Sequence, residues 1–150
     1  MTEVLFYHLQ RQPLERVLPT LLERSLERGW RVVVQASSDE RIEALYAHLW
    51  TYGDDNFLPH GTAREPEAAE QPILLTTGEH NPNGAKVRFL IDGTAVPADV
   101  ATYERIVLLF DGEDEDAVAA ARACWGEVKA PAFDATYWQP DEQRRWDKKA

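Results

Sequence analysis

The fold class is inferred from residues 4–36, which read VLFYHLQRQPLERVLPTLLERSLERGWRVVVQA. This stretch opens with a short apolar and aromatic run, Val4 to Leu9, and closes with a second, Arg31 to Ala36; such runs are typical of buried strands. Between them, apolar residues recur at three- and four-residue steps from Leu14 to Leu26, which predicts an amphipathic helix. Pro19 lies inside this pattern, so the helix either begins just before it or bends there.

The rest of the chain continues the alternation of strands and helices. Ser37 followed by Glu40 forms a capping-box pattern, which opens a helix expected to run to about Trp50. Residues 51–72 have the glycines and prolines of an irregular loop. The remaining patterns predict strands at Ile73–Thr76, Val87–Ile91 and Arg105–Phe110, a helix at Asp114–Trp125 and a short polar helix within residues 139–149.

This order of elements predicts an α/β fold. Strand–helix–strand units join parallel strands through helical crossovers, and the wholly apolar run Ile106–Phe110 suits a central strand that is covered on both faces. The sequence contains no internal repeat or linker, and its length of 150 residues fits one domain. We therefore predict a single domain over residues 1–150, a three-layer α/β/α sandwich with a mostly parallel central sheet.

The charge of the chain is acidic and unevenly distributed. Its 16 basic and 26 acidic side chains give a formal net charge of −10, which argues against a protein that binds nucleic acid over its whole surface. Residues 1–120 carry 10 basic and 21 acidic side chains, whereas residues 121–150 carry 6 and 5. The C-terminal fifth is therefore where we expect an anion to bind.

Composition also bears on the compartment. A single cysteine, Cys124, excludes an internal disulfide and suits a reducing environment. The first residues lack the pattern of a signal peptide, and no apolar run approaches the ~20 residues of a membrane span. These features predict a cytoplasmic protein without a membrane segment.

Motifs for nucleotide or metal chemistry are missing from the sequence. The turn after the first strand reads Gln10-Arg11-Gln12-Pro13 instead of a glycine-rich phosphate loop, no Walker-type motif occurs, and the four histidines lack ligand-like spacing. The fold is therefore expected to resemble nucleotide-binding folds without having a nucleotide site, a cofactor or a metal. A binding module is favoured over an enzyme.

One acidic run leaves an alternative open. Residues 111–116 read Asp-Gly-Glu-Asp-Glu-Asp after a predicted strand, and Asp92 ends another strand. Asp92 and Asp111 could hold Mg²⁺ in a nucleotide hydrolase or phosphotransferase. The same run also suits a turn followed by a helix N-cap, where negative charge complements the helix dipole. The second interpretation is favoured.

Aromatic residues gather in two clusters. The first comprises Leu49-Trp50-Thr51-Tyr52 and Phe57-Leu58-Pro59-His60-Gly61, which either fill the core or form a patch for a partner.

The second cluster comprises Arg122 and Trp125, three apart on one helix face, then Lys129, Tyr137-Trp138 and Trp146. It suits a peptide with a hydrophobic residue and a terminal carboxylate, or else Trp125 and Trp138 belong to the core. Stacking of single-stranded DNA on these rings is disfavoured by the charge.

At these clusters the sequence resembles the chi subunit of the bacterial DNA polymerase III holoenzyme, an accessory subunit of the clamp-loader assembly. The resemblance covers nearly the whole chain. It is carried by Phe6-Tyr7, Gly29–Val34, Leu49-Trp50, Asp55–Gly61, Gln71-Pro72-Ile73, Ala121-Arg122-x-x-Trp125 and Tyr137-Trp138. The Trp50-to-His60 segment and the Ala-Arg-x-x-aromatic element are fairly specific when they occur together.

The resemblance implies a non-catalytic subunit of a DNA-directed DNA polymerase (nucleotidyltransferase) complex with two protein partners. One is the psi subunit, which tethers chi to the clamp loader. Its docking positions in the family match Trp50 and Phe57, with Pro59 and His60 as neighbours, and a helicase-like repair protein is implied to compete for this side.

The second implied partner is the acidic C-terminal tail of single-stranded DNA-binding protein, which ends in phenylalanine. Arg122 and Trp125 inherit this role, with Arg122 pairing with a carboxylate and Trp125 lining a phenylalanine pocket. Family members often have tyrosine at the Trp125 position and lysine where this chain has Gly126, so Lys129 or a C-terminal lysine is the candidate for that charge. The link to DNA is thus expected to run through another protein's tail.

Overall fold

The computed structural model describes residues 3–9, 14–51, 60–62, 66–78, 81–91, 103–129, 134–140 and 146–148. Its elements, in chain order, are β1 (Glu3–Leu9), α1 (Leu14–Glu27), β2 (Val32–Gln35), α2 (Asp39–Thr51), β3 (Gly61–Thr62), the 3₁₀ helix η1 (Ala68–Glu70), β4 (Ile73–Thr76), β5 (Val87–Leu90), β6 (Arg105–Asp111), α3 (Glu115–Lys129), β7 (Asp134–Pro140) and β8 (Trp146–Lys148).

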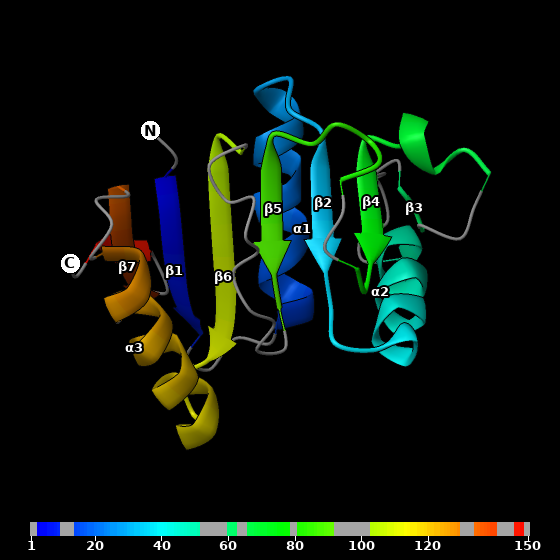
Figure 1. Ribbon diagram of the computed structural model, residues 1–150. Coiled ribbons are helices and arrows are strands. Elements are labelled where there is room, and N and C mark those ends of the chain that lie inside the picture. Colours follow the sequence, from blue (N-terminus) through cyan, green and yellow to red (C-terminus); the bar gives the residue numbers. More distant parts are fainter. Residues whose placement is uncertain are drawn as a thin grey trace.

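The strands form one sheet in the order β3-β4-β2-β5-β6-β1-β7-β8 (Figure 1). Strands β1 to β7 pair in parallel, and β8 alone is antiparallel, against β7. The predicted α/β class with a mostly parallel sheet is confirmed. Because β1 to β7 run the same way, their amino ends lie at the top of Figure 1 and their carboxyl ends at the bottom.

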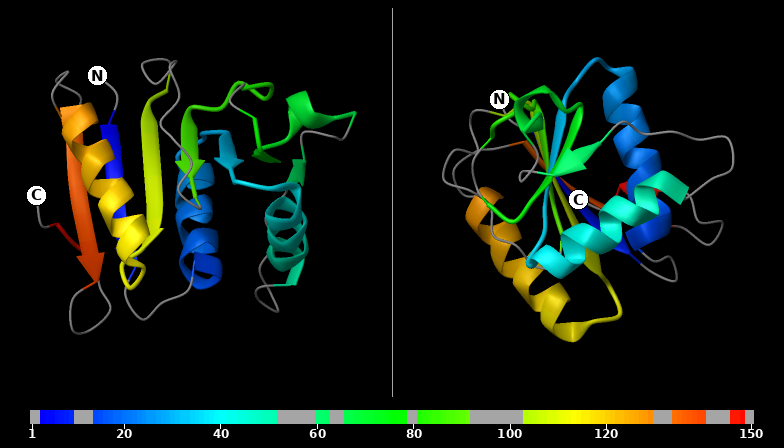
Figure 2. Two further views of the ribbon diagram at one scale, coloured as in Figure 1. Left: turned by 60° about the horizontal axis from the view of Figure 1, so that its bottom comes forward. Right: turned by 90° about the vertical axis from the view of Figure 1, so that its right-hand side faces the viewer.

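The helices cover the two faces of the sheet. Helices α1 and α2 lie on one face and α3 lies on the other (Figure 2), which gives the three predicted layers. Alternation along β1 assigns Leu5 and Tyr7 to the core under α1 and α2, and Val4 and Phe6 to the core under α3. The described part of the chain contains no helix that is both long and apolar enough to cross a membrane.

The prediction of a terminal helix within residues 139–149 was wrong. This region contains the end of β7 and the strand β8, with Pro140 opposite Trp146 in the antiparallel register. The physical reason is that β1 needs a partner on its outer edge, and Asp134–Trp138 supplies it in parallel register with Glu3–Tyr7. Pairing with an existing sheet overrides local preference, and a proline also disfavours a helix interior.

Helix starts are set by single side chains. The α2 cap is Ser38, whose Oγ accepts the backbone N–H of Arg41 at 3.2 Å, so the cap lies one residue later than the predicted Ser37. At α3, Asp114 Oδ1 accepts the N–H groups of Asp116 and Ala117 at 3.0 and 3.3 Å. The interpretation of the acidic run as a turn and helix N-cap is confirmed.

Pro19 lies within α1, which begins at Leu14 and not just before the proline. A proline has no N–H, so the carbonyl of Glu15, four residues earlier, loses its usual partner within the helix. His48 of α2 replaces it, because its Nε2 lies 2.6 Å from the Glu15 oxygen and must donate to it. Arg41 adds an ion pair to the Glu15 carboxylate at 2.7 Å, so α2 compensates for the proline in α1.

This compensation is testable by a double-mutant cycle. His48→Leu leaves the Glu15 carbonyl without the His48 hydrogen bond and should lower the free energy of unfolding by about 1–2 kcal/mol. In a Pro19→Ala background, the restored N–H at residue 19 can bond the same carbonyl, so the cost of His48→Leu should fall to below about half of that value. Equal costs in both backgrounds, measured by urea denaturation, would contradict the pairing.

Candidate functional site

The predicted site residue Trp125 lies over an aromatic floor between α3 and the sheet. Its ring meets Phe6 of β1 edge-on at a centroid distance of 5.3 Å and Tyr137 of β7 at 6.0 Å. Trp125 is half-buried, with one part packed on the core under α3 and the rest open to solvent. The ring of Trp125 therefore has both a core contact and an accessible aromatic surface.

Arg122 lies one turn before Trp125 on α3 and is exposed. Burial lowers the pKa of His8 and raises that of Tyr137, and the nearby charge of Arg122 acts on both groups in the lowering direction. The structure thus brings Arg122 and Trp125 to one face of α3, above the ends of β1 and β7. Lys129 ends the same helix, four residues beyond Trp125.

His8 is part of this site, although the sequence did not single it out. It is buried, and its Nδ1 lies 2.7 Å from the Tyr137 hydroxyl. Burial lowers the pKa of His8, the Arg122 cation lowers it further, and the Asp111 carboxylate acts in the opposite direction. The imidazole therefore adds no positive charge at neutral pH. Alternation along β1 was the available signal, because Phe6 and His8 point to the same face.

Tyr137 and Trp138, which the sequence placed in one cluster, belong to opposite faces of β7. Tyr137 packs under α3, and burial raises its pKa against the opposing charge of Arg122. Trp138 packs on the other face, stacked on Tyr7 at 6.3 Å, with its Nε1 donating to the Thr136 hydroxyl at 2.9 Å. The α3 site therefore includes Tyr137 but not Trp138.

The second group of predicted site residues is described only in part. Trp50 lies in the last turn of α2, whereas Phe57 and Pro59 lie outside the described residues. His60 is buried, its Nε2 lies 3.0 Å from the Tyr46 carbonyl oxygen, and its ring meets the Tyr46 ring at 4.9 Å. His60 thus anchors the chain against α2 just after the segment that carries Phe57 and Pro59.

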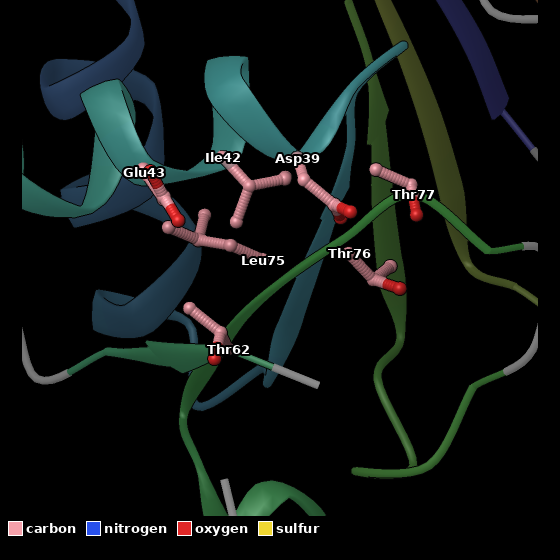
Figure 3. A pocket seen from close by; sticks show the side chains of 7 residues that line it. All are labelled: Asp39, Ile42, Glu43, Thr62, Leu75, Thr76 and Thr77. Carbon is pink, nitrogen blue, oxygen red and sulfur yellow. The ribbon is translucent and has the colours of Figure 1, made fainter. Parts of the chain in front are cut away.

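A pocket of about 150 Å³ opens at the carboxyl end of the sheet, between α2, β3 and β4 (Figure 3). Ile42 and Leu75 supply its apolar wall, and the polar lining is Asp39, Glu43, Thr62, Thr76 and Thr77. Among these described lining residues there is no lysine or arginine, so the pocket does not have the chemistry of a phosphate site. Its lining is acidic and hydroxyl-rich.

The metal-binding alternative gains no support from the described residues. Asp111 is exposed and its carboxylate accepts the Glu113 N–H at 2.9 Å, as in a local turn. Asp92 lies outside the described residues. Within the described part of the chain, no three His, Cys, Asp or Glu side chains come together as metal ligands.

Comparison with known proteins decides the family. The model of the family described as "DNA polymerase III chi subunit, HolC" matches residues 1–136. The chain belongs to the chi family. One relative is a DNA polymerase III subunit chi from Pseudomonas aeruginosa, 31% identical over 113 residues, with 73% of this chain and 77% of the relative covered. Another is a probable subunit chi from Rickettsia prowazekii, 28% identical over 117 residues, covering 74% and 71%.

One solved structure has a fold similar to that of this chain. The C-terminal domain of S. cerevisiae Dbp5, solved with Gle1 and IP6, superposes with a TM-score of 0.54 at 12% identity and covers 91% of this chain and 90% of that one. At this identity the likeness concerns the fold alone. Membership of the chi family, in contrast, supports an accessory role of this chain in DNA replication.

Proposed function

We propose that this chi-family chain is a non-catalytic accessory subunit of the DNA polymerase III holoenzyme that binds the acidic C-terminal tail of single-stranded DNA-binding protein at α3. The observation that supports this is the position of an exposed arginine, Arg122, one helical turn from the half-buried Trp125. A cation and an aromatic wall at this spacing suit a peptide that carries carboxylates and ends in phenylalanine.

The floor of the site favours an anion. Arg122 stands over His8 and Tyr137, which are uncharged at neutral pH because burial lowers the pKa of His8 and raises that of Tyr137. The exposed guanidinium thus borders a partly apolar surface, where an ion pair is stronger than one surrounded by water on all sides. A terminal carboxylate pairs with Arg122 while the phenylalanine ring packs on Trp125, and Lys129 is the candidate for a contact with a further acidic residue.

Binding of one tail is expected to be weak. A charge-assisted arginine pair contributes about 1.5–3 kcal/mol, and a micromolar complex corresponds to about −8 kcal/mol in total. Several tails on one DNA-coated oligomer raise the effective affinity. Weak multiple contacts would let the polymerase assembly hold the lagging-strand template and still move along it.

The second part of the proposal concerns the clamp loader. The psi subunit docks on the side that carries Trp50 and Phe57, with Pro59 and His60 as neighbours, and a helicase-like repair protein competes for the same side. The buried His60, whose Nε2 lies 3.0 Å from the Tyr46 carbonyl oxygen, joins the chain to α2. Helix α2 lies on the opposite face of the sheet from α3 (Figure 2).

The α3 assignment is tested by titrating a synthetic acidic peptide with a free C-terminal phenylalanine into the full-length chain. Arg122→Ala should weaken binding at least about tenfold, because one charge-assisted pair is lost. Phe57→Ala is the matched control, since it should leave peptide affinity unchanged while weakening capture of psi. Equal affinity of the wild-type and Arg122→Ala proteins in calorimetry would exclude this role of Arg122.

A further inference from the structure

A second group of arginines surrounds Trp30 at the amino end of the sheet. Trp30 follows α1 and is half-buried. The guanidinium carbons of Arg28 and Arg105 lie 5.2 and 5.3 Å from the centre of its ring, within range of cation–π contact. We call Arg24, Arg28, Trp30 and Arg105 the Trp30 patch. It lies near the upper end of α1 in Figure 1.

Arg24 joins the patch from the last turn of α1, and Arg28 is the first residue after that helix. The charges of Arg105, Arg24 and Arg28 all reach the phenol of Tyr7, whose pKa burial raises and these cations partly lower. Three guanidinium groups, from the last turn of α1, the residue after it and the start of β6, therefore lie near one region.

The patch is partly preorganised. Glu3 holds Arg105, accepting from its Nε and Nη2 at 3.0 and 2.8 Å, and Arg105 is only 20% exposed. Arg24 and Arg28 are exposed, and the indole holds the guanidinium of Arg28. A planar guanidinium presents paired N–H groups to a carboxylate, and ordering it beforehand lowers the entropy lost on binding.

We propose that the Trp30 patch is a docking surface for a short acidic segment of a partner protein, whose carboxylates pair with Arg24 and Arg28 and whose apolar side chain packs on Trp30. This surface is separate from the α3 site. Arg122 and Trp125 lie under the opposite face of the sheet, since α1 and α3 cover different faces (Figure 2). The proposal goes beyond the proposed function and does not depend on it.

Charge at the rim favours a short acidic segment over an extended polyanion such as a nucleic acid strand, because the surrounding carboxylates repel both and only the short segment can stay within the patch. Exposed carboxylates border the arginines, with Glu27 at the end of α1, Glu104 just before β6, and Glu3 beside Arg105. A single strand that continued beyond the patch would meet these carboxylates and an overall charge of −10. A protein segment with a few carboxylates can end where the patch ends.

The test uses a short fluorescein-labelled peptide with a few glutamates and one leucine, whose termini are both blocked so that it offers the α3 site no terminal carboxylate. Fluorescence anisotropy with the full-length chain should show salt-sensitive binding. The double variant Arg24→Gln, Arg28→Gln should weaken it at least about tenfold. Arg16→Gln, at an exposed arginine near the other end of α1, is the matched control and should bind as the wild type does. Because Arg24 and Arg28 are exposed, melting temperatures should stay within about 2 °C, which excludes unfolding as the cause.

Three outcomes would overturn the proposal. The first is equal affinity of the wild type and the double variant for the peptide. The second is tighter binding of labelled oligothymidylate than of the peptide, lost in the double variant, which would assign the patch to single-stranded nucleic acid. The third is self-association in sedimentation that the double variant abolishes, which would make a second copy of the chain the occupant. The free-carboxylate peptide and Arg122→Ala test the α3 site independently.

Discussion

Arg88→Ala is expected to destabilise this chain more than any other single substitution considered. Arg88 lies in the middle of β5 and is fully buried. Its Nε and Nη2 donate to Gln35 Oε1 at 2.9 and 2.6 Å, and its Nη1 donates to the Tyr103 hydroxyl at 3.0 Å. Nη2 also donates to the Gly78 carbonyl oxygen, so one side chain links β2, the segment after β4 and the segment just before β6.

Alanine would remove all of these donors at once. The acceptors on Gln35, Tyr103 and Gly78 would each lose a hydrogen bond in a region closed to water, and the missing side chain would leave a cavity. We expect the free energy of unfolding to fall by about 4 kcal/mol and the melting temperature by roughly 10 °C. Urea and thermal denaturation followed by circular dichroism would measure both quantities.

Two variants serve as controls for Arg88→Ala. Tyr103→Phe removes one hydroxyl acceptor and keeps the ring, so it should cost only about 1 kcal/mol. Arg31→Ala also removes an arginine that donates to two carbonyl oxygens, those of Ala69 and Asn83, but Arg31 is exposed. It should cost less than about 1 kcal/mol. If the Arg88→Ala and Arg31→Ala proteins had the same melting temperature, the buried hydrogen-bond network would contribute little to stability.

Gly112→Ala is expected to have the second-largest effect. Gly112 lies directly after β6, and its N–H donates to the Leu9 carbonyl oxygen at 2.7 Å. A Cβ at this position would overlap the imidazole of His8 and lie 2.8 Å from the Leu9 oxygen. His8 is buried and hydrogen-bonded to Tyr137, so it cannot move away without loss. We expect a cost of about 3 kcal/mol, as in an overpacked core.

The cause of the Gly112 effect can be separated by a second change. His8→Ala removes the ring that the new methyl group meets, so it should recover more than half of the loss in the double variant. Gly29→Ala is the contrasting control: its φ of 80° strains an alanine, but open space surrounds its Cβ. Its smaller cost, about 1 kcal/mol, should not change in the His8→Ala background. An unchanged cost of Gly112→Ala without His8 would contradict the steric explanation.

Gly112→Ala also bears on the candidate site, because His8 and Tyr137 form the floor beneath Arg122. Displacing His8 should therefore weaken binding of the free-carboxylate peptide as well as lower stability. His8→Ala alone should weaken peptide binding less than Arg122→Ala does, because it removes a floor contact and leaves the cation in place.

Much of the fold was predictable because local pattern and tertiary structure agree in most elements. The run Ile106–Phe110 is apolar at every position, and in the structure it lies in a strand between β5 and β1, buried on both faces. The α1 pattern persisted through Pro19 because a side chain of another helix, His48, satisfies the carbonyl that the proline leaves. The terminal strands β7 and β8 were not predicted, and a helix was expected in part of their place, because they form by pairing with an edge of the sheet, which no local pattern encodes.

The part of the candidate site that lies on α3 was predictable from the sequence, whereas the residues of the sheet beneath it were not. Arg122 and Trp125 are three residues apart, so their shared face follows from helical periodicity. His8 and Tyr137 lie 129 positions apart in the sequence and meet only because β7 joins the outer edge of β1. Arg88 was likewise overlooked, since a charged residue inside an apolar run looks like an imperfect strand until its buried acceptors are seen.

By itself the sequence determined the α/β class, the places of most strands and helices, and the resemblance of the chain to the chi family. These depend on periodicity and on motifs, which are local properties of the chain. The distribution of charge did not follow from the sequence. Arg24, Arg28 and Arg105 lie in the acidic first 120 residues, where an anion was not expected to bind. The topology places the end of α1 beside the start of β6, so only the tertiary structure gathers these cations around Trp30.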